Sequence, residues 1–138
     1  MQYSPMVERH FRAPVGAGAP RYDTGRWVRG EAGERALGTH IVFHLRAEAG
    51  RVAELRFQAF GCPHTIAACS LAAERLSGQP VEALREFSPR CIAAALDLPV
   101  EKLGRLLMVE DALRNCFVAW DNSQLDLQNQ RVEPWRSA

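Results

Sequence analysis

The amino-acid sequence predicts a single α+β domain, in which helices cover one face of a small antiparallel sheet. Three observations support this prediction: two alternating segments joined by a tight turn, three helical patterns after them, and a length of 138 residues of which 47% are hydrophobic. A chain of this size can bury one core rather than two, so residues 1–138 are predicted to form one domain. Strands followed by a run of helices are typical of α+β folds.

Residues 1–25 are predicted to form a short helix and a flexible connector. Ser4 followed by Pro5 is a typical helix start, because the hydroxyl can cap the helix and proline suits its first position. This helix is expected to end near Phe11, since residues 13–25 contain two prolines and three glycines. Residues 27–29 are compatible with a short strand, and residues 30–38 are predicted to be a second flexible stretch.

Residues 39–46 and 53–59 alternate in hydropathy and predict a β-hairpin with its turn at residues 48–51. The apolar face is expected to hold the following residues: Ile41, Phe43, Leu45, Ala53, Leu55, Phe57 and Ala59. On the opposite face, His40 and His44 are expected to be solvated and about 13 Å apart, too far to chelate one ion without other elements.

Three helical patterns follow and can cover the apolar face of the hairpin. Residues 65–77 carry an apolar stripe and stop at Gly78, which can adopt a left-handed cap, before Pro80. Residues 91–96 are alanine-rich, and residues 103–120 carry apolar side chains at steps of three and four. Residues 121–138 are polar and are predicted to be a frayed C-terminal tail.

The charge balance excludes several classes of function. With 17 basic and 16 acidic residues, the net charge of +1 provides no broad field for a nucleic-acid backbone or an anionic membrane. No apolar run reaches membrane-spanning length and the N-terminus lacks a signal-peptide pattern, so a cytoplasmic location is expected. Four cysteines without a CxxC pair argue against a zinc ribbon or a disulfide framework.

Cys62 is the candidate reactive group, because it follows a predicted strand and Gly61 and precedes a predicted helix. Unpaired N–H groups and the helix dipole at such a position favour the thiolate. The alternative is a small buried residue in a tight turn. His64 could be a second ligand, an acid–base partner or an exposed residue, whereas Cys69, Cys91 and Cys116 are expected to serve packing.

Residues spread over most of the chain resemble the IscU/NifU N-terminal family of iron–sulfur cluster assembly scaffolds, from Tyr3 to about Trp120. The matching positions are Tyr3, Ser4, Val7, His10, Phe11, Pro14, Gly18, Arg56, Phe57, Phe60, Gly61, Cys62, Ile66, Ala67, Ser70, Leu71 and Glu110 to Leu113. The resemblance implies a scaffold rather than an enzyme. It also implies sulfur supply by a cysteine desulfurase and cluster transfer with the help of a chaperone.

The family resemblance also implies a metal site of three cysteines, an aspartate and often a histidine, and most of these positions are replaced here. The first cysteine falls at Leu37, the aspartate at Thr39, the histidine at Gly104 and the third cysteine at Arg105. Only Cys62 remains as a metal ligand. Because a closed site needs about four donors, an iron–sulfur cluster or zinc is expected only if other ligands rebuild the site.

Two further expectations follow from the resemblance. The chaperone-binding motif falls on residues 98–102, which keep Leu98, Pro99 and Lys102 as candidate partner-binding residues. If the fold is shared, Arg105 should approach Cys62 and lower the pKa of its thiol, unless it pairs with an acidic neighbour.

Three functions are consistent with these observations. The first is an atypical scaffold for iron–sulfur cluster assembly. The second is a ligand-depleted paralogue that binds the desulfurase or another partner and modulates assembly without holding metal. The third, ranked last, is a sulfur carrier or enzyme that uses Cys62 with His64 and Arg105.

Overall fold

The computed structural model describes residues 3–21 and 25–132, and within them the predicted α+β fold is confirmed. The strands form one antiparallel sheet in the order β1-β2-β3. Along the chain the elements are α1 (Pro5–Arg12), β1 (Val28–Glu34), η2 (Arg35–Leu37), β2 (Thr39–Glu48), β3 (Arg51–Phe60), α2 (Pro63–Leu76), η3 (Val81–Glu86), α3 (Pro89–Leu96), η4 (Val100–Lys102) and α4 (Leu103–Val132).

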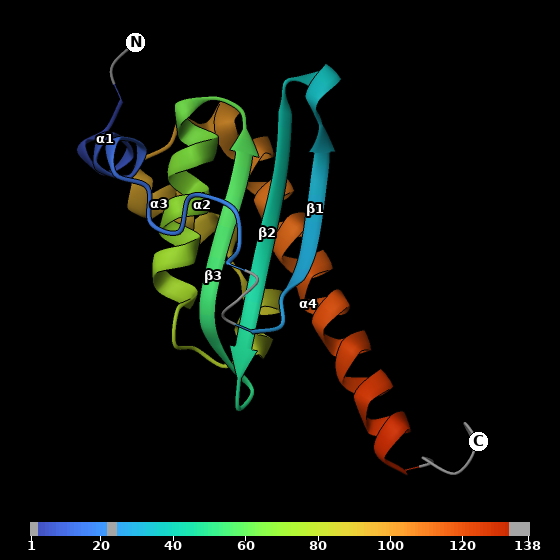
Figure 1. Cartoon of the computed structure of the whole chain (residues 1–138). Coiled ribbons are helices and arrows are strands. Elements are labelled where there is room, and N and C mark those ends of the chain that lie inside the picture. The colour runs from blue at the N-terminus through green and yellow to red at the C-terminus, as the bar shows by residue number, and fades with distance from the viewer. Residues whose placement is uncertain (1–2, 22–24, 133–138) are drawn as a thin grey trace.

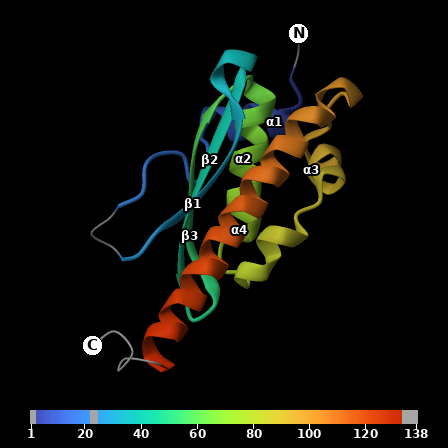
Figure 2. The same cartoon turned by 90° about the vertical axis from the view of Figure 1, so that its right-hand side faces the viewer.

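The helices lie on one face of the sheet, as the two views in Figures 1 and 2 show. α2 contacts β3, α4 contacts β1 and β2, and α1 and α3 pack on the outside of these two helices. The core between sheet and helices is fully apolar at its centre. Its largest buried side chains include Ile41, Phe43, Leu45, Leu84, Leu96, Leu106 and Leu113.

The hairpin of β2 and β3 is confirmed, but one residue of its predicted apolar face is wrong. The turn is formed by Ala49 and Gly50, both with positive φ, as the twist of a two-residue hairpin turn requires. A register shift at Arg46 and Ala47 places Val52 opposite Ala47. Val52 is therefore in the core and Ala53 is exposed, because a bulge reverses the side-chain alternation beyond it.

The predicted flexible stretch 30–38 is mostly strand, since β1 continues to Glu34. Its glycines obscure the strand pattern, and Gly30 has a packing reason. A Cβ atom there would lie 2.0 Å from the backbone nitrogen of Cys116 and 2.6 Å from the carbonyl oxygen of Ala112. Glycine at this position lets the backbone of β1 approach α4 directly.

The expectation that both strand histidines are solvated is wrong for His44. The connector after α1 passes across the face of the sheet opposite the helices (Figures 1 and 2) and contacts it through Gly18 beside Arg56 and Gly25 beside Arg46. His44 is only 6% exposed and its Nε2 lies 2.9 Å from the amide oxygen of Gln58. The connector therefore gives the sheet a second, partly polar cover.

The prediction that the last helix ends at Trp120 and that a frayed tail follows is also wrong. α4 is continuous to Val132, and Figure 1 shows its C-terminal part projecting past the end of the sheet. That part needs no apolar stripe because it contacts solvent, and Leu125 is half exposed. Residues 133–138 of the predicted tail lie outside the described residues. Among the helices described, none is long and apolar enough to cross a membrane.

Candidate functional site

The candidate site lies at the end of the sheet where β2 begins and β3 ends. His40 pairs with Phe60, so Thr39 and Cys62 extend the two strands at the same end. η2 joins this end through Arg35, whose guanidinium lies 5.1 Å from the centre of the Phe60 ring. The fold therefore brings together segments that are far apart in the sequence.

Cys62 is the residue before α2 and takes an extended backbone conformation, and Pro63 opens the helix two residues before the predicted start. Its sulfur lies 3.5 Å from the hydroxyl oxygen of Thr65 and the residue is partly buried. Gly61 permits this turn, because a Cβ atom there would lie 3.1 Å from the Cβ of Thr65. The thiol is thus held at a helix start while part of it stays accessible.

The environment of Cys62 favours its thiolate. Burial by itself acts to raise the pKa of the thiol, and it is the largest single effect. Hydrogen bonds from Thr65 and from the backbone at the helix start act in the opposite direction, and the charge of Lys102 adds to them. Together they lower the pKa of Cys62 below its ordinary value.

Arg105 has a different partner from the one expected. Its guanidinium donates a hydrogen bond of 2.8 Å to the hydroxyl oxygen of Thr39, and Thr39 is fully buried. The cation that lowers the pKa of Cys62 is Lys102 instead. Thr39 and Arg105, which occupy the family positions of the aspartate and the third cysteine, are therefore adjacent here. They form a hydrogen bond between a neutral hydroxyl and a guanidinium.

The other family ligand positions also supply no donor. Leu37 lies in η2 and is 73% exposed. Gly104 is in the first turn of α4, with no atom of another element within 4 Å of the place where a Cβ would lie. Within residues 3–21 and 25–132, no group of three or more histidine, cysteine or acidic residues could hold a metal ion. Of the five ligand positions that the family resemblance gives, only Cys62 carries a thiol, imidazole or carboxylate, and Arg105 brings a guanidinium to the position of the third cysteine.

His64 is buried rather than exposed, and it is the backbone of this residue that forms a hydrogen bond with Cys62. It is 4% exposed and its ring packs edge-on against Tyr3, with 4.9 Å between the ring centres. Burial lowers the pKa of His64, and the charge of Lys102 lowers it further. The neutral ring therefore serves to fasten the start of the chain to α2.

The remaining cysteines divide into two groups. Cys69 and Cys116 are fully buried, as predicted, and burial raises the pKa of both thiols, to about 12 for Cys116. Cys91 differs from the prediction, because it is exposed in the first turn of α3 rather than packed in the core. Ile92, the next residue, is the buried one of that turn.

A polar triad was not predicted, in which His10 and Ser70 are buried and Glu74 is exposed. The Nδ1 atom of His10 lies 2.7 Å from the hydroxyl oxygen of Ser70, and Nε2 lies 3.4 Å from the carboxylate of Glu74. Ser70 also accepts a hydrogen bond from the backbone of Val15. A serine, a histidine and an acid in this order resemble a catalytic arrangement, but Ser70 is inaccessible, so the triad fixes α1 and the connector on α2. Only the matches of His10 and Ser70 to the family pattern could have indicated it.

The candidate partner-binding segment lies beside the site and is exposed in its middle, whereas Leu98 and Lys102 at its ends are partly buried. Pro99 and Val100 lie on the surface between α3 and α4, and Val100 is 86% exposed. Lys102 is the last residue of η4, and its positive charge helps to lower the pKa of Cys62. Leu37 and Phe60 add exposed apolar surface at the same end of the sheet.

The three-stranded sheet, the helices on one of its faces and the cysteine at the strand-to-helix turn make the chain a small α+β domain with its candidate site at one end of the sheet. Comparison with known proteins specifies the family: residues 2–126 match the model of the NifU-like N terminal domain, and the chain belongs to this family. The resemblance inferred from the sequence is thereby confirmed.

Individual relatives agree with this assignment. The chain is 33% identical over 117 residues to the iron–sulfur cluster assembly scaffold protein IscU of Rickettsia prowazekii, covering 83% of this chain and 88% of that protein. It is 29% identical over 127 residues to scaffold protein IscU 1 of Archaeoglobus fulgidus, covering 90% and 81%.

Two solved structures show the same fold. One is a scaffold protein of the SUF system, described as putative, from Fervidobacterium islandicum, with a TM-score of 0.62, 12% identity and coverage of 83% of this chain and 96% of that one. The other is the N-terminal part of a NifU-like protein from Brucella abortus, with a TM-score of 0.61, 14% identity and coverage of 86% and 94%.

Proposed function

We propose that this protein acts in iron–sulfur cluster assembly as a ligand-depleted scaffold, which accepts sulfur on Cys62 without holding a metal ion on its own side chains. The observation that supports the proposal most strongly is the hydrogen bond between Arg105 and Thr39 beside an intact Cys62 site. Cys62 keeps the thiol of the family pattern. Thr39 and Arg105 occupy two other ligand positions, and the guanidinium in the hydrogen bond between them disfavours a bound cation.

The chemistry of sulfur uptake uses the thiolate of Cys62. The thiolate attacks the outer sulfur of a persulfide on a cysteine desulfurase and forms a new S–S bond. The S–S bond of the donor breaks, and its electron pair leaves on the desulfurase cysteine as a thiolate. No external oxidant or reductant is needed, and a lowered pKa of Cys62 increases the fraction of the attacking form.

The replaced ligand positions argue against cluster binding by this chain alone. A bound Fe²⁺ or Zn²⁺ would lie near the fixed positive charge of Arg105, and neither Leu37 nor Gly104 offers a donor. A cluster bound here would require ligands from a partner or a second subunit. The relatives named as cluster scaffolds therefore support a role in iron–sulfur cluster assembly, whereas the side chains of this site support the step in which sulfur is accepted.

The surface around Cys62 is suited to a protein partner. Leu37, Phe60 and Val100 expose apolar area at the same end of the molecule as the thiol. We expect the desulfurase to contact this end, and a chaperone to contact Leu98, Pro99 and Lys102. These partners are the ones that the family resemblance implies, and the exposure of Pro99, with Leu98 and Lys102 partly accessible beside it, is compatible with them.

Persulfide mapping tests the proposal. The protein is incubated with a cysteine desulfurase and L-cysteine, alkylated and digested, and sulfane sulfur is located by mass spectrometry. We expect it on Cys62, absent from Cys62→Ser and unchanged in Cys91→Ser, which removes the other accessible thiol. Equal labelling of Cys62 and Cys91, or none above a reaction without desulfurase, would contradict the proposal.

A further inference from the structure

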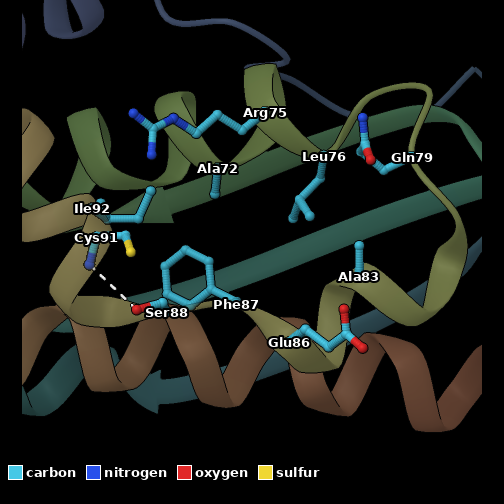
Figure 3. Close-up of a pocket in the computed structure, with 10 residues that line it drawn as sticks. All are labelled: Ala72, Arg75, Leu76, Gln79, Ala83, Glu86, Phe87, Ser88, Cys91 and Ile92. Carbon is cyan, nitrogen blue, oxygen red and sulfur yellow. Dashed lines mark hydrogen bonds between the residues drawn. The ribbon is translucent and has the colours of Figure 1, made fainter.

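A cavity of about 270 Å³ lies between the C-terminal half of α2, η3 and the first turn of α3 (Figure 3). It is separate from the proposed sulfur site, because Cys62 precedes α2 whereas the cavity begins ten residues further along that helix. From Cys62 to Arg75 the helix rises about 20 Å. The cavity therefore offers a second place where the surface can bind a small molecule.

The floor of the cavity is apolar and its rim carries two charges of opposite sign. The floor consists of Ala72, Leu76, Ala83, Phe87 and Ile92. Arg75 comes from α2 and Glu86 from η3, and Figure 3 shows them on opposite walls of the opening. Within the described residues neither side chain makes a hydrogen bond or an ion pair, although several other arginines of the chain pair with carboxylates.

Two unpaired charges of opposite sign across a small cavity match the charge pattern of an α-amino acid. Arg75 can bind the α-carboxylate through two N–H donors, and Glu86 can accept hydrogen bonds from the α-ammonium group. The apolar floor between them suits a short side chain with little polarity.

A thiol lies at the same cavity. Cys91 is exposed at the start of α3, where its backbone N–H is capped by the hydroxyl of Ser88, and Figure 3 shows its sulfur at the cavity edge near the Phe87 ring. A ligand held between Arg75 and Glu86 that carries sulfur in its side chain would place that sulfur on the floor, within reach of this thiol.

We propose that the cavity binds a small disulfide with amino-acid ends, with L-cystine as the simplest example, and that Cys91 forms a mixed disulfide with it. The thiolate of Cys91 attacks one sulfur of the bound disulfide and forms a new S–S bond. The original S–S bond breaks, and its electron pair leaves on the second sulfur, which takes up a proton as free cysteine. Cys91 is oxidised and the departing half is reduced, so the disulfide itself is the oxidant.

Thiol-exchange rates measured with two disulfides test the proposal. The protein is mixed with L-cystine or with uncharged 2-hydroxyethyl disulfide, quenched with acid, and the modified cysteine is mapped by mass spectrometry. Arg75→Gln and Glu86→Gln should each slow the reaction of Cys91 with cystine by about tenfold or more, because each removes a charge-assisted contact with the ligand. Both variants should change its reaction with the uncharged disulfide less than twofold.

Arg90→Gln is the matched control, because Arg90 adjoins Cys91 in the sequence but does not line the cavity. It should affect both disulfides equally. All three side chains are exposed, so the variants should keep the wild-type unfolding midpoint. The proposal is overturned if Arg75→Gln and Glu86→Gln slow both disulfides to the same extent. It is also overturned if Arg90→Gln reproduces their effect, or if cystine modifies Cys62 and leaves Cys91 free.

Discussion

Replacing Gly30 by alanine should destabilise the protein strongly, because β1 and α4 touch backbone to backbone at this residue. The added Cβ would lie 2.0 Å from the nitrogen of Cys116, whereas ordinary contact begins at 3.4 Å. The strand or the helix must move by more than about 1 Å, and a close-packed core does not yield so far without losing contacts. No flexible side chain can move aside, since the nearest atoms all belong to the backbone of α4.

We expect Gly30→Ala to lower the free energy of unfolding by about 3 kcal/mol, the upper end of the cost of overpacking a core. For a domain of this size, that corresponds to a decrease in melting temperature of about 10 °C. Urea unfolding followed by far-UV circular dichroism measures the free energy, and calorimetry measures the melting temperature.

Gly104→Ala is the matched control, because the same methyl group is added in the first turn of α4 where it meets nothing within 4 Å. It should raise the free energy of unfolding by about 0.5–1 kcal/mol, since alanine is the better helix former. If Gly30→Ala unfolds within 1 kcal/mol of the wild type, the direct packing of β1 on α4 is refuted.

Three further predictions concern the site and the buried histidines. Thr39→Val should lower the free energy of unfolding by about 1–2 kcal/mol, because Arg105 loses its hydrogen-bond acceptor. Thr39→Ser keeps a hydroxyl and should retain most of the wild-type stability, and urea unfolding midpoints test both variants. Thr65→Val should raise the pKa of Cys62, and pH-dependent alkylation would show an unchanged profile if the Thr65 contact had no effect. The free energy of unfolding should fall as the pH decreases from about 6.5, the pKa of histidine in the unfolded chain, through the lower pKa values of three buried histidines in the folded protein. In this range the unfolded chain binds protons that the folded protein does not. These histidines are His10, His44 and His64, and a flat urea midpoint between pH 7.5 and 5 would contradict this.

The local patterns of the sequence predict the elements whose apolar residues face the core. The hairpin and α2 show a clear periodicity because each turns its apolar residues toward the core, and the capping of α1 by Ser4 and Pro5 is a local property of those residues. The continuation of β1 beyond residue 29 was missed because Gly30 fits the strand to α4, and the residues that explain it, Ala112 and Cys116, lie more than 80 positions away in the sequence. The extension of α4 past Trp120 was missed because a solvated helix needs no apolar stripe.

The candidate site was predictable in part for the same reason. The position of Cys62 at a strand-to-helix turn is local and was predicted from six residues. The partner of Arg105 is not local, because Thr39 meets it only after the sheet and α4 have packed. His44 is buried on the face of the sheet that the helices do not cover, and no pattern within the strand indicates that burial.

Metal and acid-labile sulfide content after anaerobic purification tests the central proposal most directly. It should be measured for the wild type, for Cys62→Ser, and for a variant that restores the family ligands through Leu37→Cys, Thr39→Asp and Arg105→Cys. We predict equally low content in the wild type and Cys62→Ser, and stoichiometric metal in the restored variant, which has the four donors a closed site needs. Near-stoichiometric metal in the wild type that disappears in Cys62→Ser would contradict the account.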